Sequence, residues 1–197
     1  SKIYFFILLF MNKEEAKKIL ESANKNFLSK KYSIARELWL KCLKINPDNI
    51  SVLSSIALTY FNERKLQETE KFLRKILDLN FSEPRVLTML ILVLEDQDKI
   101  LEAKEFIQLG LKEKVLDHHW KIKMDTMMPI IKFDNLEIEK TRLEVEKNLD
   151  KTLEDTFEYK LNIDNQMIRP LQFGLSYDQF NNLELNKKCV KFYKKVY

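Results

Sequence analysis

Small residues recur in this chain at intervals of 34 positions. Two series have this spacing: Ala35, Thr69 and Ala103, and Ala23, Ala57 and Ile91, where Thr69 and Ile91 depart mildly from the small type. Repeats of about this length form one helix–turn–helix unit each. A single unit cannot bury its apolar face, so neighbouring units must stack. The period therefore predicts a stacked array of helix pairs over residues 12–117, an architecture that usually binds other molecules and rarely catalyses reactions.

The overall composition agrees with a helical protein. The 197 residues include only two Gly and four Pro, which indicates long helices and few tight turns. Hydrophobic residues make up 45% of the chain, an ordinary value for a globular protein with a real core. An all-α fold is therefore expected.

Three units can be followed along the chain in one phase. They run over residues 16–49, 50–83 and 84–117. Turn residues 29–31 join the first two helices, and Pro47 ends the second helix, because proline cannot continue one. The packing positions predicted for the six helices are Ile19, Ala23 and Phe27; Ala35, Trp39 and Cys42; Leu53, Ile56, Ala57 and Tyr60; Thr69, Leu73 and Ile76; Leu87, Leu90, Ile91 and Leu94; and Ala103, Ile107 and Gly110.

These units resemble the tetratricopeptide repeat. The matching residues are Ala23, Tyr60, Ala35, Trp39 and Pro47, with their counterparts 34 residues away. The resemblance implies an all-α, tetratricopeptide-type helical solenoid of three repeats over residues 12–117, with residues 118–197 as a helical appendage. Residues 1–11 form an apolar leader or the edge of a fragment in this division.

In tetratricopeptide proteins the first helices line a concave groove. The resemblance therefore implies a partner-binding groove that holds a protein or peptide, and Lys17 is expected on the groove side with the residues that follow. Its predicted residues are Leu20, Asn24, Phe27, Ser54, Leu58, Phe61, Thr88, Leu92 and Glu95. Two alternatives stay open: these positions form a merely solvated inner face, or the appendage folds over them. The groove has no cluster of Lys and Arg to clamp a carboxylate terminus.

An unbroken apolar run, from Ile3 to Phe10, precedes the repeats. It is shorter than the roughly 20 apolar residues that span a bilayer. No small-residue cleavage site of a signal peptide follows it. One explanation is that Met11 is the true start and residues 1–10 are upstream read-through or a fragment edge. The alternative is a shortened membrane anchor or export signal; membrane contact is not expected.

Charge and cysteine content narrow the functional classes. The chain has 34 basic and 30 acidic residues, so despite its pI of 8.8 no nucleic-acid partner is expected. Its two cysteines, Cys42 and Cys189, are too few and too far apart for a disulfide framework, which predicts a reducing compartment, the cytoplasm. The sequence leaves the oligomeric state open.

No catalytic, cofactor-binding or metal-binding residues are predicted. His118 and His119 are adjacent, and neighbouring residues of a helix point about 100° apart, so the two do not form a metal site alone. No catalytic triad or pair of carboxylates emerges from the spacing of the other polar residues. The chain by itself is therefore not expected to be an enzyme.

The appendage is predicted to contain a cap and two helices. Trp120, with Met124, Met127 and Met128, is expected to cover the open end of the repeat array. A helix is predicted from 135 to about 159, residues 168–177 form a loop, and a last helix begins near 181. The inner stripes of the two helices are Ile138, Arg142, Val145, Leu149 and Leu153, and Leu185, Cys189, Phe192 and Val196. The lysines of the last helix suggest a solvated face or, alternatively, contact with RNA or membrane.

Residues 128–193 resemble, in the order of their motifs, the region just upstream of the catalytic domain in bacterial SPINDLY-like O-linked N-acetylglucosamine transferases. The matching pieces are Met128-Pro129-Ile130-Ile131, Glu137-Ile138, Arg142, the stretch from Phe173 to Leu185, and Phe192-Tyr193. Met128, Ile131 and Phe180 depart from that family's usual residues. The first helices also lack the recurring Asn of animal relatives, so an equivalent way of holding a peptide backbone is not implied.

This second resemblance implies the substrate- or partner-recruiting front of a protein O-GlcNAc transferase-like enzyme whose catalytic domain is absent from the chain. The segment up to Tyr197 contains no Gly-rich phosphate-binding loop, so these residues alone are expected to show no glycosyltransferase activity. The alternative is a stand-alone scaffold or adaptor that binds a partner peptide, with no enzyme attached.

Overall fold

The computed structural model describes residues 2–128, 135–160 and 183–197. Within these ranges the regular elements are all α-helices, which confirms the all-α class predicted from the repeat. The chain divides into two compact units, residues 1–93 (unit 1) and residues 94–197 (unit 2). Each unit is described by itself.

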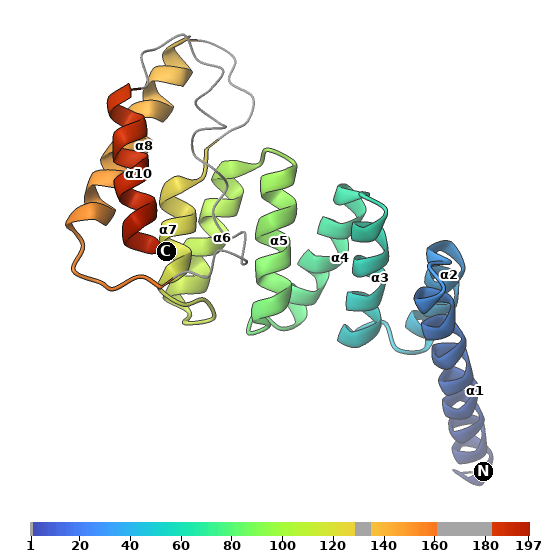
Figure 1. The fold of residues 1–197 in the computed structure, drawn as a ribbon. Helices are drawn as coiled ribbons and strands as arrows, with labels where there is room; N and C mark the ends of the chain where they lie inside the picture. The colour runs from blue at the N-terminus through green and yellow to red at the C-terminus, as the bar shows by residue number, and fades with distance from the viewer. Residues whose placement is uncertain (1, 129–134, 161–182) are drawn as a thin grey trace. The chain divides into compact units, whose positions relative to one another are not determined.

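Unit 1 consists of consecutive helix pairs (Figure 1). Its elements are α1 (Lys2–Leu28), α2 (Tyr32–Ile45), α3 (Ile50–Asn62), α4 (Leu66–Leu79) and the part of α5 (Pro84–Asp96) up to Val93. Helix α1 packs against α2, α3 packs against α4, and α2 lies next to α3. This is the helix–turn–helix order that the 34-residue period predicts.

Most helix boundaries follow from local sequence. Helix α2 ends at Ile45, two residues before Pro47, and α5 begins at Pro84, in the first turn, where proline is tolerated. Asn49 caps α3, because its side-chain oxygen accepts a hydrogen bond from the Val52 amide at 3.1 Å. The exception is α1, which begins at Lys2, well before the expected start near residue 16. The apolar run therefore continues the first repeat helix.

The turn inside each repeat has the same backbone geometry. Lys30, Arg64 and Asp98 stand 34 residues apart, and all three have a positive φ of 58° or 59°. In each turn the following amide reaches back to a carbonyl five residues earlier, as Lys65 does to Tyr60 at 2.9 Å. A left-handed residue of this kind is a common way to end a helix.

The small residues of the repeat occupy the centre of the helix packing. All six members of the two series have an exposed fraction of 0%: Ala23, Ala57, Ile91, Ala35, Thr69 and Ala103. The side chain of Thr69 stays compatible with burial because its hydroxyl donates to the carbonyl of Lys65 at 2.8 Å. Their burial confirms the register predicted from the sequence.

One charged residue lies within the α2–α3 contact of unit 1. The Arg36 side chain is only 9% exposed, and its guanidinium lies 4.4 Å from the centre of the Tyr60 ring. It also forms an ion pair with Glu63 at 2.9 Å. Hydrogen bonding from Lys65, and then from Arg36, keeps the pKa of Glu63 below its usual value. Arg36 thereby joins consecutive repeats through a cation–π contact and an ion pair.

Unit 2 holds the remaining helices around a separate core. After the last turn of α5 come α6 (Ile100–Lys112), α7 (His119–Thr126), α8 (Asn135–Glu154) and α10 (Leu183–Val196). Helix α7 lies against both α6 and α8, and α8 packs against α10. A buried cluster joins α7, α8, α10 and the segment after α8: Ile122, Val145, Leu149, Tyr159, Leu185, Cys189, Phe192 and Val196. The inner stripe predicted for the last helix is confirmed, whereas the loop expected at 168–177 lies outside the described residues.

Two predictions for unit 2 need correction. Helix α8 ends at Glu154 and not near 159, and Tyr159 is buried in the core from a non-helical segment. Of the proposed cap residues, Trp120, Met124 and Met128 are only half-buried, whereas Met127, directly after α7, is buried. The buried face of this segment also includes Ile122 and Lys123, which the cap prediction did not contain.

Lys123 is buried because it has an acidic partner. Its ammonium group lies 2.5 Å from a carboxylate oxygen of Glu95, and the two side chains are only 2% and 5% exposed. Other ion pairs of unit 2 lie nearer the surface, such as Lys104 with Glu144 at 2.7 Å and Lys188 with Glu146 at 2.7 Å. A buried charge is tolerated only when it is paired and hydrogen-bonded.

The lysines of α10 divide into two groups. Lys188 bridges Glu146 and Asp150 of α8, which raises its pKa, and Lys195 donates to the carbonyls of Leu153 and Asp155. Lys187, Lys191 and Lys194 are exposed.

In the part of the chain that the structure describes, no helix is both long and apolar enough to cross a membrane.

Candidate functional site

The predicted groove residues occupy three equivalent positions on the first helix of each repeat. We call the nine of them the first-helix face: Leu20, Asn24 and Phe27 on α1, Ser54, Leu58 and Phe61 on α3, and Thr88, Leu92 and Glu95 on α5. All but Glu95 belong to unit 1. The nine fall into three sets of positions that are equivalent in the sequence, 34 residues apart, and we call each set a row.

Two leucines in one row of the first-helix face are exposed. Leu58 is 38% exposed and Leu92, 34 residues later, is 39% exposed. The residue before each of them, Ala57 or Ile91, is completely buried. Helices α3 and α5 therefore each bury one side in the core. On the other side, each exposes a leucine at the equivalent position.

The residues on α1 have a second role in packing. Leu20 and Phe27 are half-buried and pack against the core cluster formed by α1, α2 and α3. The Phe27 ring lies 5.6 Å from Tyr32 and 5.8 Å from Trp39, measured between ring centres. Asn24 is exposed. The α1 part of the face thus presents a polar side chain between two apolar residues that are partly core.

Glu95 differs from the other eight residues. Only 4% of it is exposed, and its carboxylate pairs with Lys123 inside unit 2. The side chain therefore stabilises the packing of α7 and does not present a carboxylate to solvent. The hydroxyl of Thr88, in another row, donates to the Arg85 carbonyl at 3.0 Å.

Helix α3 shows a further property of this face. Residues 50–62 contain no Asp, Glu, Lys or Arg, although eight of the thirteen are at least partly exposed. The second helices of unit 1 carry exposed charges, such as Lys41 on α2 and Lys71 and Lys75 on α4. Solvated helix faces normally carry charged side chains. The sequence shows this charge-free run directly. The run distinguishes α3 from the other described helices as a candidate binding surface, which helical periodicity alone does not do.

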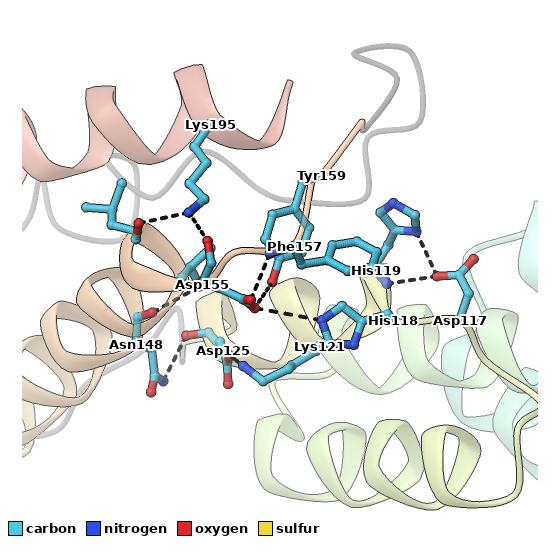
Figure 2. Close-up of polar contacts among 12 residues, drawn as sticks. Asp117, His118, His119, Lys121, Asp125, Asn148, Asp155, Phe157, Tyr159 and Lys195 are labelled. Carbon is cyan, nitrogen blue, oxygen red and sulfur yellow. Dashed lines mark hydrogen bonds and ion pairs between the residues drawn. The ribbon is translucent and has the colours of Figure 1, made fainter.

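A second arrangement of polar and aromatic groups lies in unit 2 (Figure 2). The start of α7 meets the segment after α8, where the His118 ring is centred 4.5 Å from the Phe157 ring. Its Nε2 atom lies 3.9 Å from Oδ2 of Asp155. His119 lies beside Asp117, with its Nδ1 atom 3.2 Å from Oδ1. The two histidines thus face different carboxylates.

Asp155 is the centre of this second arrangement. The Tyr159 hydroxyl donates to Asp155 at 2.7 Å, and the Phe157 amide donates at 3.0 Å. These bonds, with that from Tyr159 first, hold the pKa of Asp155 below its usual value. Burial, and then the carboxylate of Asp155, raises the pKa of Tyr159. The geometry is that of a turn held against α7.

Within the described ranges, His, Cys, Asp and Glu side chains do not gather in groups of three that would suit a metal ion. No pattern in the sequence predicts the contact between His118 and Phe157. The two residues are far apart in the chain, and Phe157 lies beyond the end of α8, where helical periodicity no longer applies.

Comparisons with known proteins define the fold only. No protein-family model matches the chain, and no curated protein matches it. Among solved structures, the MamA protein aligns with a TM-score of 0.58 at 16% identity, covering 93% of this chain and 91% of that one. This alignment confirms the all-helical solenoid fold and shows nothing beyond the fold.

Two further structures align less well. The first TPR of Spaghetti (RPAP3), bound to the HSP90 peptide SRMEEVD, has a TM-score of 0.48 at 21% identity and covers 58% of this chain and 90% of that one. The Sgt2 TPR domain from Aspergillus fumigatus has a TM-score of 0.45 at 16% identity and covers 77% of this chain and 89% of that one.

Proposed function

We propose that this chain is a protein-binding scaffold that holds a segment of a partner protein on its first-helix face. The observation that carries the proposal is the exposure of Leu58 and Leu92 in one register, each beside a completely buried residue. A partner lying across α3 and α5 would contact both leucines. Repeat proteins bind in this way, through rows of equivalent side chains on consecutive units.

The alternative of a merely solvated face is less consistent with the charges. Exposed helix faces that only meet water carry Lys, Glu and similar residues. The first-helix face has Leu, Phe, Ser, Thr and Asn at its exposed and half-exposed positions. This mixture of apolar and small polar groups suits a peptide better than bulk water.

Site-specific photo-crosslinking tests the proposal. A benzophenone amino acid placed at position 58 in the full chain, in cells of its source, should crosslink to a defined partner protein. The same group at Lys71, on the exposed side of α4, is the matched control. Identical products from the two positions would contradict the proposal, since the first-helix face would then have no preference.

A second test separates binding from folding. Phe61 is half-buried, and Phe61→Ala should reduce capture of the crosslinked partner. The free energy of unfolding should change by no more than about 1 kcal/mol, as is usual for partly exposed positions. Full capture by this variant would remove Phe61 from the binding surface.

The finer proposal is that this scaffold is the front of an O-GlcNAc transferase-like enzyme. The ordered motifs between Met128 and Tyr193 support it, although residues 129–134 and 161–182 lie outside the described residues. Reading the coding sequence past Tyr197 tests it: a continuation into a glycosyltransferase domain is expected, and an unrelated gene after a stop codon would refute it. The chain itself should neither transfer sugar from UDP-N-acetylglucosamine nor release UDP.

The alternative is a stand-alone adaptor with no enzyme attached. The same coding-sequence test decides between the two, because a stop codon directly after Tyr197 favours the adaptor. In both cases the partner is a protein or peptide. A cytoplasmic location, inferred from cysteine use, stays a prediction that fractionation of the source cells can check.

A further inference from the structure

Helix α3 presents a surface without charge at the middle of the first-helix face. We call it the neutral patch; it comprises Ser51, Ser54, Ser55, Leu58, Phe61 and Asn62, all exposed or half-buried. At about 100° per residue these six positions fall within an arc of about 120° on one side of the helix. The opposite side is the core, where Leu53, Ile56 and Ala57 are 0% exposed.

Charged residues lie near the two ends of the neutral patch. The positions equivalent to Ser51 in the neighbouring repeats are Lys17 on α1 and Arg85 on α5, and both are exposed. Glu63, Arg64 and Lys65 follow the C-terminal end of α3. The surface is thus neutral along α3 and charged near its two ends.

Helix α2 packs a cation, Arg36, against α3, and the contacts of this cation are internal. Arg36 is buried, with its guanidinium over the Tyr60 ring and paired with Glu63. Tyr60 points to the core side of α3, away from the arc of the neutral patch. Arg36 therefore offers no counter-charge to a group bound on Leu58.

We propose that the neutral patch is the centre of the partner-binding surface and takes an uncharged segment of a partner protein, with a bulky apolar side chain seated on Leu58 and Phe61. This inference rests on the proposed function. Cores of protein interfaces are depleted of charged residues and enriched in aromatic ones, and they have a polar rim. A charged side chain seated on Leu58 and Phe61 would lose hydration against a helix that carries no opposite charge, which disfavours acidic and basic segments.

Selection from a phage-displayed library of random 12-residue peptides tests the inference on the full chain. Enriched peptides should have a net charge near zero and contain at least one large aliphatic or aromatic residue. Leu58→Glu should weaken their binding at least about tenfold, because the partner's apolar group would meet a charge. Leu58→Met, which keeps the position apolar, and Lys71→Glu on α4 should retain binding.

The possible outcomes separate this inference from the function on which it rests. Enrichment of acidic or basic peptides that Leu58→Glu affects would refute the neutral partner and leave the scaffold intact. Enrichment of neutral peptides that bind Leu58→Glu normally would refute the placement on α3. Failure to enrich any peptide, with the photo-crosslink at position 58 also absent, would refute the scaffold function. Trp39 fluorescence during urea unfolding, in a Trp120→Phe background, verifies that each variant is folded.

Discussion

Units 1 and 2 differ in how much of their interior the 34-residue repeat accounts for. Unit 1 uses Ala23, Ala35 and Ala57 to bring its helices together, and each is completely buried at a position fixed by the 34-residue period. Unit 2 places an ion pair, Glu95 with Lys123, among its buried side chains. Small residues at helix contacts recur with the repeat, so a sequence predicts them. A buried ion pair involves two residues that do not recur, so a sequence does not predict it.

The chain provides one fluorescent reporter for each unit. Its two tryptophans are Trp39, in unit 1, and Trp120, in unit 2. In a Trp39→Phe background, fluorescence reports unfolding of unit 2, and in a Trp120→Phe background it reports unfolding of unit 1. Every variant below is compared with its own background protein.

The largest effect is expected at the buried ion pair. Lys123→Met leaves the carboxylate of Glu95 buried without its ammonium partner. We expect the free energy of unfolding of unit 2 to fall by about 3–5 kcal/mol, the usual cost of breaking a buried pair from one side. Urea unfolding followed by Trp120 fluorescence measures the loss.

Two controls accompany this measurement. Lys121→Met breaks the more exposed pair with Asp125 in the same helix and should cost at most about 1 kcal/mol. Adding Glu95→Leu to Lys123→Met removes the buried carboxylate as well and should restore most of the loss. If Lys123→Met cost no more than Lys121→Met, the pair would not support the core of unit 2.

A smaller effect is expected from overpacking unit 1. Ala57 is completely buried in α3, so Ala57→Phe forces a ring into space that the neighbouring helix occupies. The free energy of unfolding of unit 1, measured with Trp39, should fall by about 1–3 kcal/mol. The same urea midpoint as the background protein would mean that the repeat register is wrong.

A smaller, pH-dependent effect is expected at Asp155. The folded state lowers the pKa of this carboxyl, so its contribution to stability is present above the ordinary aspartate pKa of about 4. That contribution is lost as the pH falls through the lowered pKa of the folded state. The stability gap between the background protein and Asp155→Asn should therefore be widest near neutral pH and narrow in acid. A gap at Asp155 that stays constant across this pH range would contradict the assignment.

The smallest effect is expected on the exposed side of α10. Lys187 pairs with Glu184 at 2.7 Å, but both side chains are more than half exposed. Lys187→Gln should change the free energy of unfolding of unit 2 by less than about 0.5 kcal/mol. A larger loss of unfolding free energy, measured with Trp120 fluorescence, would show that this exposed ion pair stabilises unit 2 more than exposed pairs usually do.

The sequence predicts much of the helical framework for a physical reason. Packing positions such as Ile56, Leu73 and Leu90 must face a neighbour in every repeat, so periodicity finds them, and each is at most 1% exposed. Helix ends next to Pro47 and Pro84 are equally predictable, because proline restricts the backbone locally. The inner stripe of α10 follows from helical spacing in the same way.

Other features depend on contacts that no local pattern encodes. Lysine is usually a surface residue, and Lys123 can be buried because its ammonium group pairs with Glu95. Tyr159 lies beyond the end of α8 and reaches the core because Asp155 and the ring of Phe157 turn the chain back. For the first-helix face, the sequence places the positions on their helices, and what binds there stays a proposal.

The repeated turn geometry has a consequence for how an array of this kind can change its length. Lys30, Arg64 and Asp98 share one left-handed backbone conformation and one spacing. Removing or duplicating a complete 34-residue segment therefore rejoins two equivalent turns, and each junction keeps its local exit direction. A cut of any other size joins unlike backbone conformations and shifts the buried alanines out of phase. Engineered variants of the array should therefore keep their packing when their lengths differ by multiples of 34 residues.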